Sequence, residues 1–244
     1  PGSGERMRVV RGLWRVTDMR MWTRLLLVSA ITSLAMSQAS AAMVSWADWM
    51  SSDDTTATGE IGVDSDSVAV TTTSTGGFWG VQTGTGTNYF DPDTPYLSAD
   101  VENAPPAAEQ VQLNAGGTVT IEFSQPIEDP LLALVSWNGN TVEFGTAIEF
   151  LSYGPGYWGS GTPIINADGT GFLGSGELHG VLRLPGVFSS ISFTHTSEGW
   201  HGFTVGISGL ADEPMPPTPT PEPGSLALLL AGLAGLQVAR RRKL

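Results

Sequence analysis

The stretch Thr118-Val119-Thr120-Ile121-Glu122-Phe123 alternates polar and apolar side chains. A period of two is typical of a β-strand with one face buried and the other in water. Soon afterwards, Leu131-Leu132-Ala133-Leu134-Val135-Ser136-Trp137 is apolar almost throughout, which predicts a strand buried on both faces. Both stretches therefore indicate β-sheet.

Further strand candidates follow at short intervals, separated by turn-forming residues such as Asn138-Gly139, which predicts a tight turn. Closely spaced short strands without intervening helices predict one all-β domain, an antiparallel β-sandwich or jelly-roll-like fold, over residues 42–211. Its first part, 43–110, is rich in Thr and Gly and is expected to supply edge strands and long loops. The other strand candidates are 141–144, 146–151, 177–184, 187–194 and 202–208.

Charge is distributed unevenly along the chain. Residues 42–213 hold one basic residue, Arg183, and 21 of the 24 acidic residues, which gives this segment a formal net charge of −20. A nucleic-acid partner is not expected, because phosphates are neutralised by Lys and Arg. The chain has no cysteine, which excludes disulfides, thiolate metal sites and a cysteine nucleophile.

The N-terminal segment, residues 1–41, combines an N-terminal extension with the three parts of a secretory signal peptide. Two arginines precede an apolar run at 25–36, and Ala39 and Ala41 then provide an A-x-A cleavage site. As a helix the apolar run would rise only about 18 Å, which is too short to span a bilayer comfortably. We therefore expect a signal helix that is cleaved after Ala41, followed by an exported mature protein.

The composition changes again after the β-rich segment. Residues 212–223 are dominated by proline, which does not support helix or sheet hydrogen bonding and predicts an extended stalk. The last segment, 224–244, begins with an apolar stretch, 224–239, that predicts a short transmembrane helix of about 24 Å. A basic tail follows and is expected to stay on the cytoplasmic side: Arg240, Arg241, Arg242 and Lys243.

The order of these C-terminal parts resembles the PEP-CTERM sorting domain of Gram-negative bacteria. Pro221, Glu222 and Pro223 form its motif, and the resemblance covers about residues 219–243. It implies export by the secretion machinery, transient anchoring in the inner membrane, and recognition by exosortase, a membrane enzyme that cuts near the motif. The protein would end at the cell surface or in the extracellular biofilm matrix. An ordinary single-pass anchor behind a proline-rich stalk is the alternative.

Two histidines near the end of the domain are candidates for a metal site. If residues 196–200 close a hairpin, His195 and His201 both have core-facing parity, and Glu198 lies in the loop between them. Two imidazoles and a carboxylate can bind Zn²⁺ or another divalent ion. The alternative is that each imidazole packs at the rim of the core, because no compact ligand pattern such as H-E-x-x-H is present.

Loop residues suggest further sites. The acidic pairs Asp53-Asp54, Asp64-x-Asp66 and Asp91-x-Asp93 are candidates for structural Ca²⁺, although no EF-hand pattern is present and a solvated acidic surface is the alternative. Residues 169–174 match G-x-G-x-x-G, but turn and strand residues rather than a helix follow them. We therefore attribute these glycines to turn chemistry and not to a dinucleotide site.

Aromatic residues flank several Gly-rich turns, and the best candidate is the loop that holds Tyr153, Tyr157 and Trp158. Exposed aromatic faces there would stack on sugar rings. The alternative is that these rings cap the ends of the sandwich, since aromatic side chains carry a large apolar area.

We therefore expect an exported, non-enzymatic surface or matrix protein with a structural or adhesive role and no cofactor, structural Ca²⁺ excepted. Two alternatives stay open. The first is a carbohydrate-binding module that binds extracellular polysaccharide through the loop from Tyr153 to Trp158. The second is a secreted metal-dependent hydrolase that uses His195, Glu198 and His201.

Overall fold

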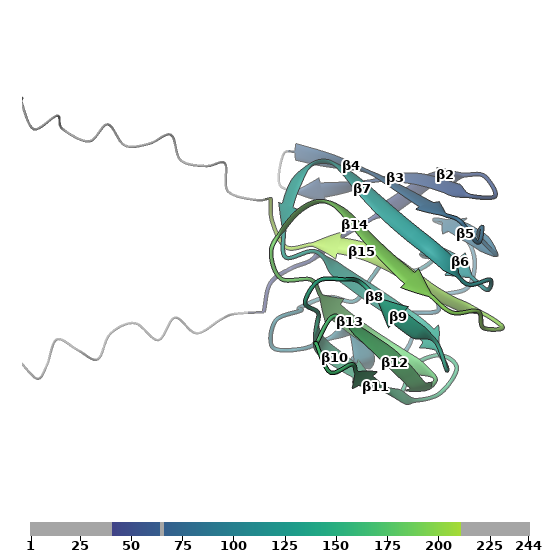
Figure 1. The fold of residues 1–244 in the computed structure, drawn as a ribbon. Helices are drawn as coiled ribbons and strands as arrows, with labels where there is room; N and C mark the ends of the chain where they lie inside the picture. The colour runs from purple at the N-terminus through teal and green to yellow at the C-terminus, as the bar shows by residue number, and fades with distance from the viewer. Residues whose placement is uncertain (1–40, 64–65, 211–244) are drawn as a thin grey trace, which may run out of the picture. The chain divides into compact units, whose positions relative to one another are not determined.

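The computed structural model describes residues 41–63 and 66–210, which form two antiparallel β-sheets packed face to face (Figure 1). These residues contain no α-helix and one 3₁₀ turn, η1 (Thr94–Tyr96). The predicted all-β class is confirmed. The predicted signal helix, proline-rich stalk and transmembrane helix lie outside the described residues.

One sheet has seven strands, in the spatial order β10-β13-β8-β15-β6-β5 with β1 paired to β15. Its strands are β1 (Ser45–Trp46), β5 (Gly80–Thr83), β6 (Glu109–Leu113), β8 (Leu131–Trp137), β10 (Glu149–Gly154), β13 (Leu178–Arg183) and β15 (His201–Ile207). The other sheet has eight strands, in the order β11-β12-β9-β14-β7-β4-β3-β2. Its strands are β2 (Asp48–Ser52), β3 (Thr56–Val63), β4 (Asp66–Ser74), β7 (Gly117–Glu128), β9 (Thr141–Glu143), β11 (Gly161–Ile165), β12 (Gly171–Gly176) and β14 (Val187–His195).

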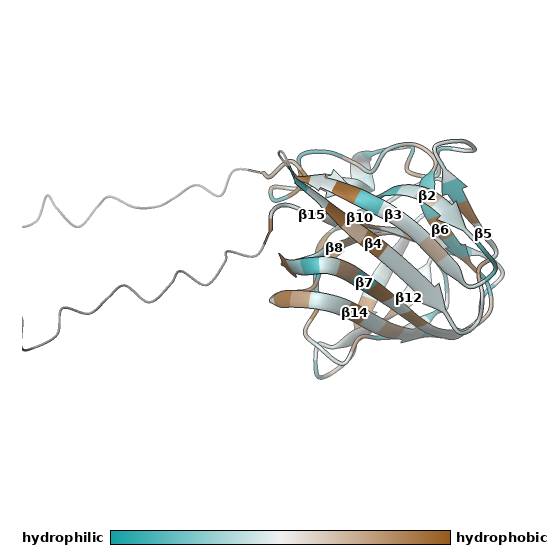
Figure 2. Cartoon of the chain, turned by 90° about the horizontal axis from the view of Figure 1, so that it is seen from above, coloured by the Kyte–Doolittle hydropathy of each residue, from teal (hydrophilic) through white to brown (hydrophobic). Residues whose placement is uncertain are grey.

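An inner core fills the space between the two sheets. On β7, Val119, Ile121 and Phe123 are buried in it, whereas the polar residues between them are more exposed. This is the alternation that the sequence predicts, and Figure 2 shows apolar and polar bands following one another along the strands. From the opposite sheet, Phe203 and Val205 on β15 pack into the same core.

An outer cluster covers the other face of the seven-stranded sheet. Strand β8 contributes to both groups, because Leu132 and Leu134 enter the inner core while Leu131, Ala133 and Val135 face the outer cluster. The prediction that this strand is buried on both faces is thereby confirmed. The other members of the outer cluster come from β1 and the residue before it, from β13 and from the long connection 84–108: Val44, Trp46, Phe90, Tyr96, Val101 and Val181.

A bulge at Ser136 turns Trp137 toward the inner core. Ser136 has a positive φ of 58°, and the pairing of β8 with β13 shifts register at this place. Its hydroxyl donates a hydrogen bond to Glu177, and the indole N–H of Trp137 donates to the carbonyl of Gly202 at 2.7 Å. Without the extra residue, simple alternation would place Trp137 on the outer face.

Two predicted turns connect different sheets. Asn138-Gly139 follows β8 in the seven-stranded sheet and leads to β9 in the eight-stranded sheet, so it does not close a hairpin. Residues 196–200 likewise carry the chain from β14 to β15, which belong to opposite sheets. The hairpin considered for 196–200 therefore does not form, because the chain passes from one sheet to the other across the core.

The expectation for the first part of the domain is only partly right. Strands β2 and β5 lie at sheet edges, but β3 and β4 are long interior strands of the eight-stranded sheet. The strand expected at 146–151 begins later, because β10 spans Glu149–Gly154.

Strands β11 and β12 were not among the candidates, and β12 contains most of the G-x-G-x-x-G match. A Cβ on Gly174 would lie 2.0 Å from the carbonyl oxygen of Trp137. Close packing of backbone on backbone therefore explains Gly174, whereas Gly169, with a φ of 74° in the turn before β12, fits the interpretation as turn chemistry.

Candidate functional site

The connection 84–108 is held over the outside of the seven-stranded sheet by polar contacts. The side chain of Asn103 pairs with the backbone of Val44, accepting at 2.7 Å and donating at 2.9 Å. The hydroxyl of Ser152 donates to the carbonyl of Pro95 at 2.7 Å. The Tyr96 hydroxyl lies 3.1 Å from His179 Nδ1, and both side chains are buried. Together these contacts fix the loop that carries Tyr89.

Four aromatic rings from three separate segments meet beside this loop. Tyr89 lies 4.8 Å from Trp200, 5.0 Å from Tyr157 and 6.3 Å from Trp158, measured between ring centroids. The planes of Tyr89 and Trp158 differ by only 24°, so their faces point in similar directions. Tyr157 and Trp158 are 44% and 54% exposed. We call Tyr89, Tyr157, Trp158 and Trp200 the aromatic platform.

Glycine shapes the loop that presents Tyr157 and Trp158. The backbones of Gly156 and Gly159 are hydrogen-bonded to each other, and Gly159 has a φ of 141°. A Cβ on Gly156 would lie 2.3 Å from the ring of His179, so only glycine fits against that imidazole. The tight turn leaves both aromatic side chains at the surface.

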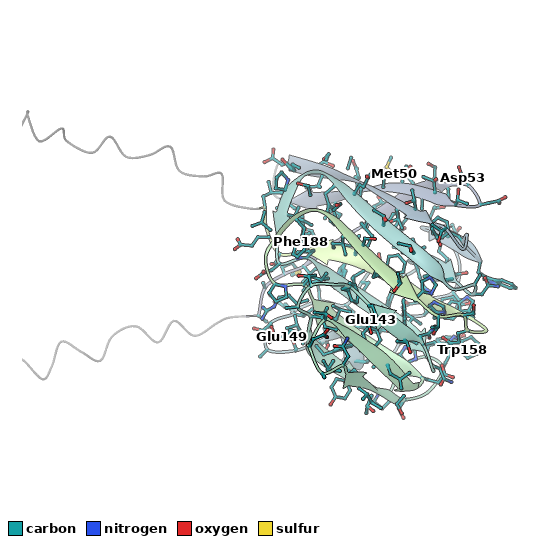
Figure 3. All side chains as sticks on the ribbon, in the orientation of Figure 1. Met50, Asp53, Glu143, Glu149, Trp158 and Phe188 are labelled. Atoms are coloured by element: carbon teal, nitrogen blue, oxygen red, sulfur yellow. The ribbon has the colours of Figure 1, made fainter. Side chains whose placement is uncertain are left out.

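The aromatic platform lies at the end of the sandwich away from the points where the described chain begins and stops. On β14, His195 pairs with Gly117 at one end of β7, and Val187 pairs with Glu128 at the other. Leu210 bridges to Ile127, close to the second end. Strand β15 separates Trp200 from Leu210, which is roughly 30 Å of extended chain. Figure 3 accordingly shows Trp158 on the opposite side from both ends of the described chain.

The three aromatic residues of the predicted sugar-stacking loop lie in two different places in the structure. Tyr157 and Trp158 belong to the aromatic platform, whereas Tyr153 pairs with Phe150 at 6.4 Å between ring centroids. Tyr153 also lines an open depression of about 470 Å³ with residues 154–155, 160–162 and 175. Tyr89 was not among the sugar-stacking candidates, because it is far from Tyr157 in sequence. Its position after a Gly-rich segment, 84–87, is the one local signal that marks it.

His195, Glu198 and His201 do come together, as predicted. His195 projects from the eight-stranded sheet and His201 from the seven-stranded sheet, and their facing nitrogens, Nδ1 and Nε2, lie 3.0 Å apart in a hydrogen bond. Glu198 Oε2 lies 3.4 Å from Nδ1 of His201, on the other edge of that ring. Among the described residues, no group of three such side chains is arranged to hold a metal ion.

Burial dominates the protonation of this group. It lowers the pKa of His201 to about 3, with a further contribution from His195, whose own pKa is also lowered by burial. Burial raises the pKa of Glu198 to about 7, although the backbone N–H of Asn138 donates to its carboxylate. The buried pair of neutral imidazoles therefore links the two sheets beneath the segment that carries Trp200.

The candidate Ca²⁺ residues have different surroundings. The Asp53 carboxylate accepts hydrogen bonds from the backbone N–H groups of Thr55 and Thr56, which hold its pKa below the ordinary value. It therefore fixes a turn between β2 and β3. Asp64 lies outside the described residues, and Asp91 and Asp93 are exposed.

Positive charge is scarce on the described domain. Arg183 is the one lysine or arginine in residues 41–63 and 66–210, and its guanidinium lies 2.5 Å from the carboxylate of Glu149. This ion pair raises the pKa of Arg183. The described surface consequently has no unpaired basic side chain with which to attract an anionic ligand.

Several predicted residues cannot be placed. Ala39 lies outside the described residues, which begin at Ala41. The same holds for the predicted sorting motif at Pro221, Glu222 and Pro223 and for the basic tail at 240–243. In the part of the chain that the structure describes, no helix has the length and hydropathy to cross a membrane.

Comparison with known proteins concerns the C-terminal segment. The family model of the PEP-CTERM protein-sorting motif matches residues 219–243. No curated protein and no solved structure matches the chain. The matched residues include the predicted Pro221-Glu222-Pro223 motif, the apolar stretch and the basic tail, so the resemblance inferred from their order is confirmed. The chain thus carries a PEP-CTERM sorting motif at its C-terminal end, which implies export and recognition by exosortase.

Proposed function

We propose that this protein is a non-catalytic structural or adhesive component of the cell surface or the extracellular matrix. The sorting motif at 219–243 is the observation that carries the proposal, since it directs export and recognition by exosortase. The apolar stretch 224–239 anchors the chain in the inner membrane until exosortase acts. The β-sandwich is then the part that functions outside the cell.

The shape of the domain supports this role. The chain leaves the sandwich near the end that holds Leu210, before the segment that leads to the sorting motif. The aromatic platform lies at the other end. The exposed rings therefore lie away from the point where the described chain stops, ahead of the sorting motif.

The placement of the polar candidates favours a role without catalysis or a cofactor. His201 has no exposed surface and His195 is 5% exposed, so a substrate does not reach their imidazoles without movement of the loop above them. The two rings are also hydrogen-bonded to each other. We accordingly assign them to the stability of the domain, and we do not propose the hydrolase.

The sorting part of the proposal can be tested with a matched pair of glutamates. Glu222 lies inside the motif, whereas Glu213 lies in the same proline-rich segment but outside residues 219–243. In a host that contains exosortase, we expect the wild-type chain and Glu213→Ala to lose the C-terminal segment, as measured by intact mass. We expect Glu222→Ala to remain uncut in the membrane fraction. Equal processing of all three chains would contradict the proposal.

The matrix role is tested by fractionation of the same cultures. We expect the processed protein to sediment with the washed extracellular polymer and to be depleted from that fraction in Glu222→Ala. A processed wild-type protein found only as free monomer in the medium would contradict the structural or adhesive role while leaving the sorting intact.

A further inference from the structure

The aromatic platform exposes more apolar surface than the fold requires. Trp158 and Tyr157 pack against other rings but keep about half of their surface in water. Single exposed aromatic residues are common, whereas a contiguous exposed group marks an interaction site. Trp79 illustrates the contrast, because it is 63% exposed and is paired with no other aromatic ring in the described chain.

The rings are held in place before any ligand arrives. Tyr89 and Trp200 are half-buried against the outer cluster and form the base for the two more exposed rings. The connection 84–108 and the Gly156–Gly159 turn are each fixed by hydrogen bonds. A preformed surface of this kind loses little conformational entropy on binding.

The chemistry of the surface defines the ligand. An aromatic face carries partial negative charge and a flat apolar area, which complements the C–H groups on one face of a pyranose ring. The residues beside the rings are exposed and small or polar, namely Asn88, Gly159, Ser160 and Gly199. Among them, the side chains of Asn88 and Ser160 can hydrogen-bond with sugar hydroxyls.

The negative charge of the domain limits which class of sugar can bind. The segment 42–213 has a formal net charge of −20, and its one arginine is paired with Glu149. A polyuronate or sulfated glycan would be repelled and would find no unpaired Lys or Arg on the described surface. We propose that the aromatic platform is a binding site for an uncharged polysaccharide, whose pyranose rings stack on Trp158 and Tyr157. The inference deepens the proposed function and rests on it for the biological setting.

The test is a direct binding measurement on the full-length chain, kept in a zwitterionic detergent that has no sugar headgroup. The probes are uncharged hexasaccharides, namely cellohexaose, mannohexaose and the fully N-acetylated chitohexaose, with an alginate hexasaccharide as the charged control. We expect at least one uncharged probe to bind and to change the tryptophan fluorescence, and alginate not to bind. Absence of binding by all three uncharged probes, or equal binding of alginate, would overturn the proposal.

Matched variants locate the site. We expect Trp158→Ala and Tyr157→Ala each to raise the dissociation constant about tenfold or more, and Trp79→Ala to leave it within about twofold, as for central and peripheral contacts. Tyr153→Ala separates the aromatic platform from the neighbouring depression and should also retain binding. Loss of affinity in Tyr153→Ala or Trp79→Ala with full affinity in Trp158→Ala would overturn the assignment. All four positions are exposed, and unchanged thermal midpoints would confirm that the variants fold.

The outcome is independent of sorting. Normal cleavage of Trp158→Ala by exosortase, together with its loss of glycan affinity, is the expected combination. Failure of the sorting test with intact glycan binding would refute the proposed location and leave the site itself supported.

Discussion

The inner core and the outer cluster are built differently, although they share strand β8. The inner core joins two sheets whose strands pair over long registers. The outer cluster is covered by β1 and by the irregular connection 84–108, which is held by a few contacts such as those of Asn103 and Tyr96. Regular alternation therefore stabilises the fold, and an irregular loop positions the aromatic platform. Such a division allows the loop to change while the sandwich persists.

The largest effect should follow truncation in the inner core. Phe203 is fully buried and packs against Phe193 from the opposite sheet, with ring centroids 5.7 Å apart. We expect Phe203→Ala to lower the free energy of unfolding by about 3–5 kcal/mol, because it removes a large apolar contact and leaves a cavity. Denaturant unfolding followed by circular dichroism measures this, and a loss below 1 kcal/mol would contradict the assignment of Phe203 to the main core.

The matched truncation in the outer cluster should act more locally. Phe90 is buried against Tyr96, with ring centroids 5.2 Å apart. We expect Phe90→Ala to cost about 1–3 kcal/mol and to open the connection 84–108 without unfolding the sheets. Thermolysin should then cut first within that connection. Degradation at the wild-type rate would contradict the local opening, and global unfolding like that of Phe203→Ala would show that the two clusters form one cooperative unit.

Low pH should destabilise the outer cluster and the inner core to different extents, because each contains a buried histidine with a different pKa. Burial lowers the pKa of His179 in the outer layer to about 4 and that of His201 in the inner core to about 3. Their contribution to stability is complete above the ordinary pKa of about 6.5 and is lost as the pH falls toward the folded values, because the unfolded chain binds protons first. We expect hydrogen exchange at pH 4 to accelerate in 84–108 before it does in β15. Faster exchange in β15 than in 84–108 would contradict the proposed difference between the two clusters.

The ionisation of Glu198 should change the stability of the domain with pH in the opposite direction to that of the histidines. Burial raises its pKa to about 7, so its ionisation disfavours the folded state increasingly between pH 4.5 and 7. We expect Glu198→Gln to match the wild type at pH 4.5 and to gain about 1–2 kcal/mol of stability at pH 8, where no buried carboxylate charge remains. Thermal midpoints across that pH range measure the difference, and a gain that does not depend on pH would rule out ionisation as its cause.

The smallest effect is expected where neither cluster is involved. Trp79 is largely exposed, and Trp79→Ala should change the free energy of unfolding by no more than about 0.5 kcal/mol. A larger loss would show that this residue belongs to one of the two clusters.

Much of the inner core could be predicted from local patterns. The alternation at 118–123 and the apolar run at 131–137 correspond to β7 and β8, and the parity of His195 and His201 places both in the core. Which sheet the next strand joins could not be predicted, because Asn138-Gly139 specifies a reversal of the chain but not its partner. The crossing at 196–200 depends likewise on strand pairings that are distant in sequence.

The aromatic platform was only half predictable for the same reason. Tyr157 and Trp158 stand in one recognisable loop, whereas Tyr89 and Trp200 reach them from other connections. The G-x-G-x-x-G segment shows a related limit, since Gly174 is required by the approach of Trp137 from another strand. Local sequence patterns predict turns and the buried faces of strands. Contacts between loops that are distant in sequence depend on the complete topology.

The scarcity of basic residues on the sandwich also affects its durability outside the cell. Trypsin-type proteases cleave after lysine or arginine, and from 42 to 213 they meet a single such bond, Arg183–Leu184. That bond lies at the end of β13, and Leu184 is fully buried with its N–H donated to the carbonyl of Pro130 at 3.0 Å. The folded domain should therefore resist digestion by this class of enzyme and outlast neighbours that display many cleavable sites.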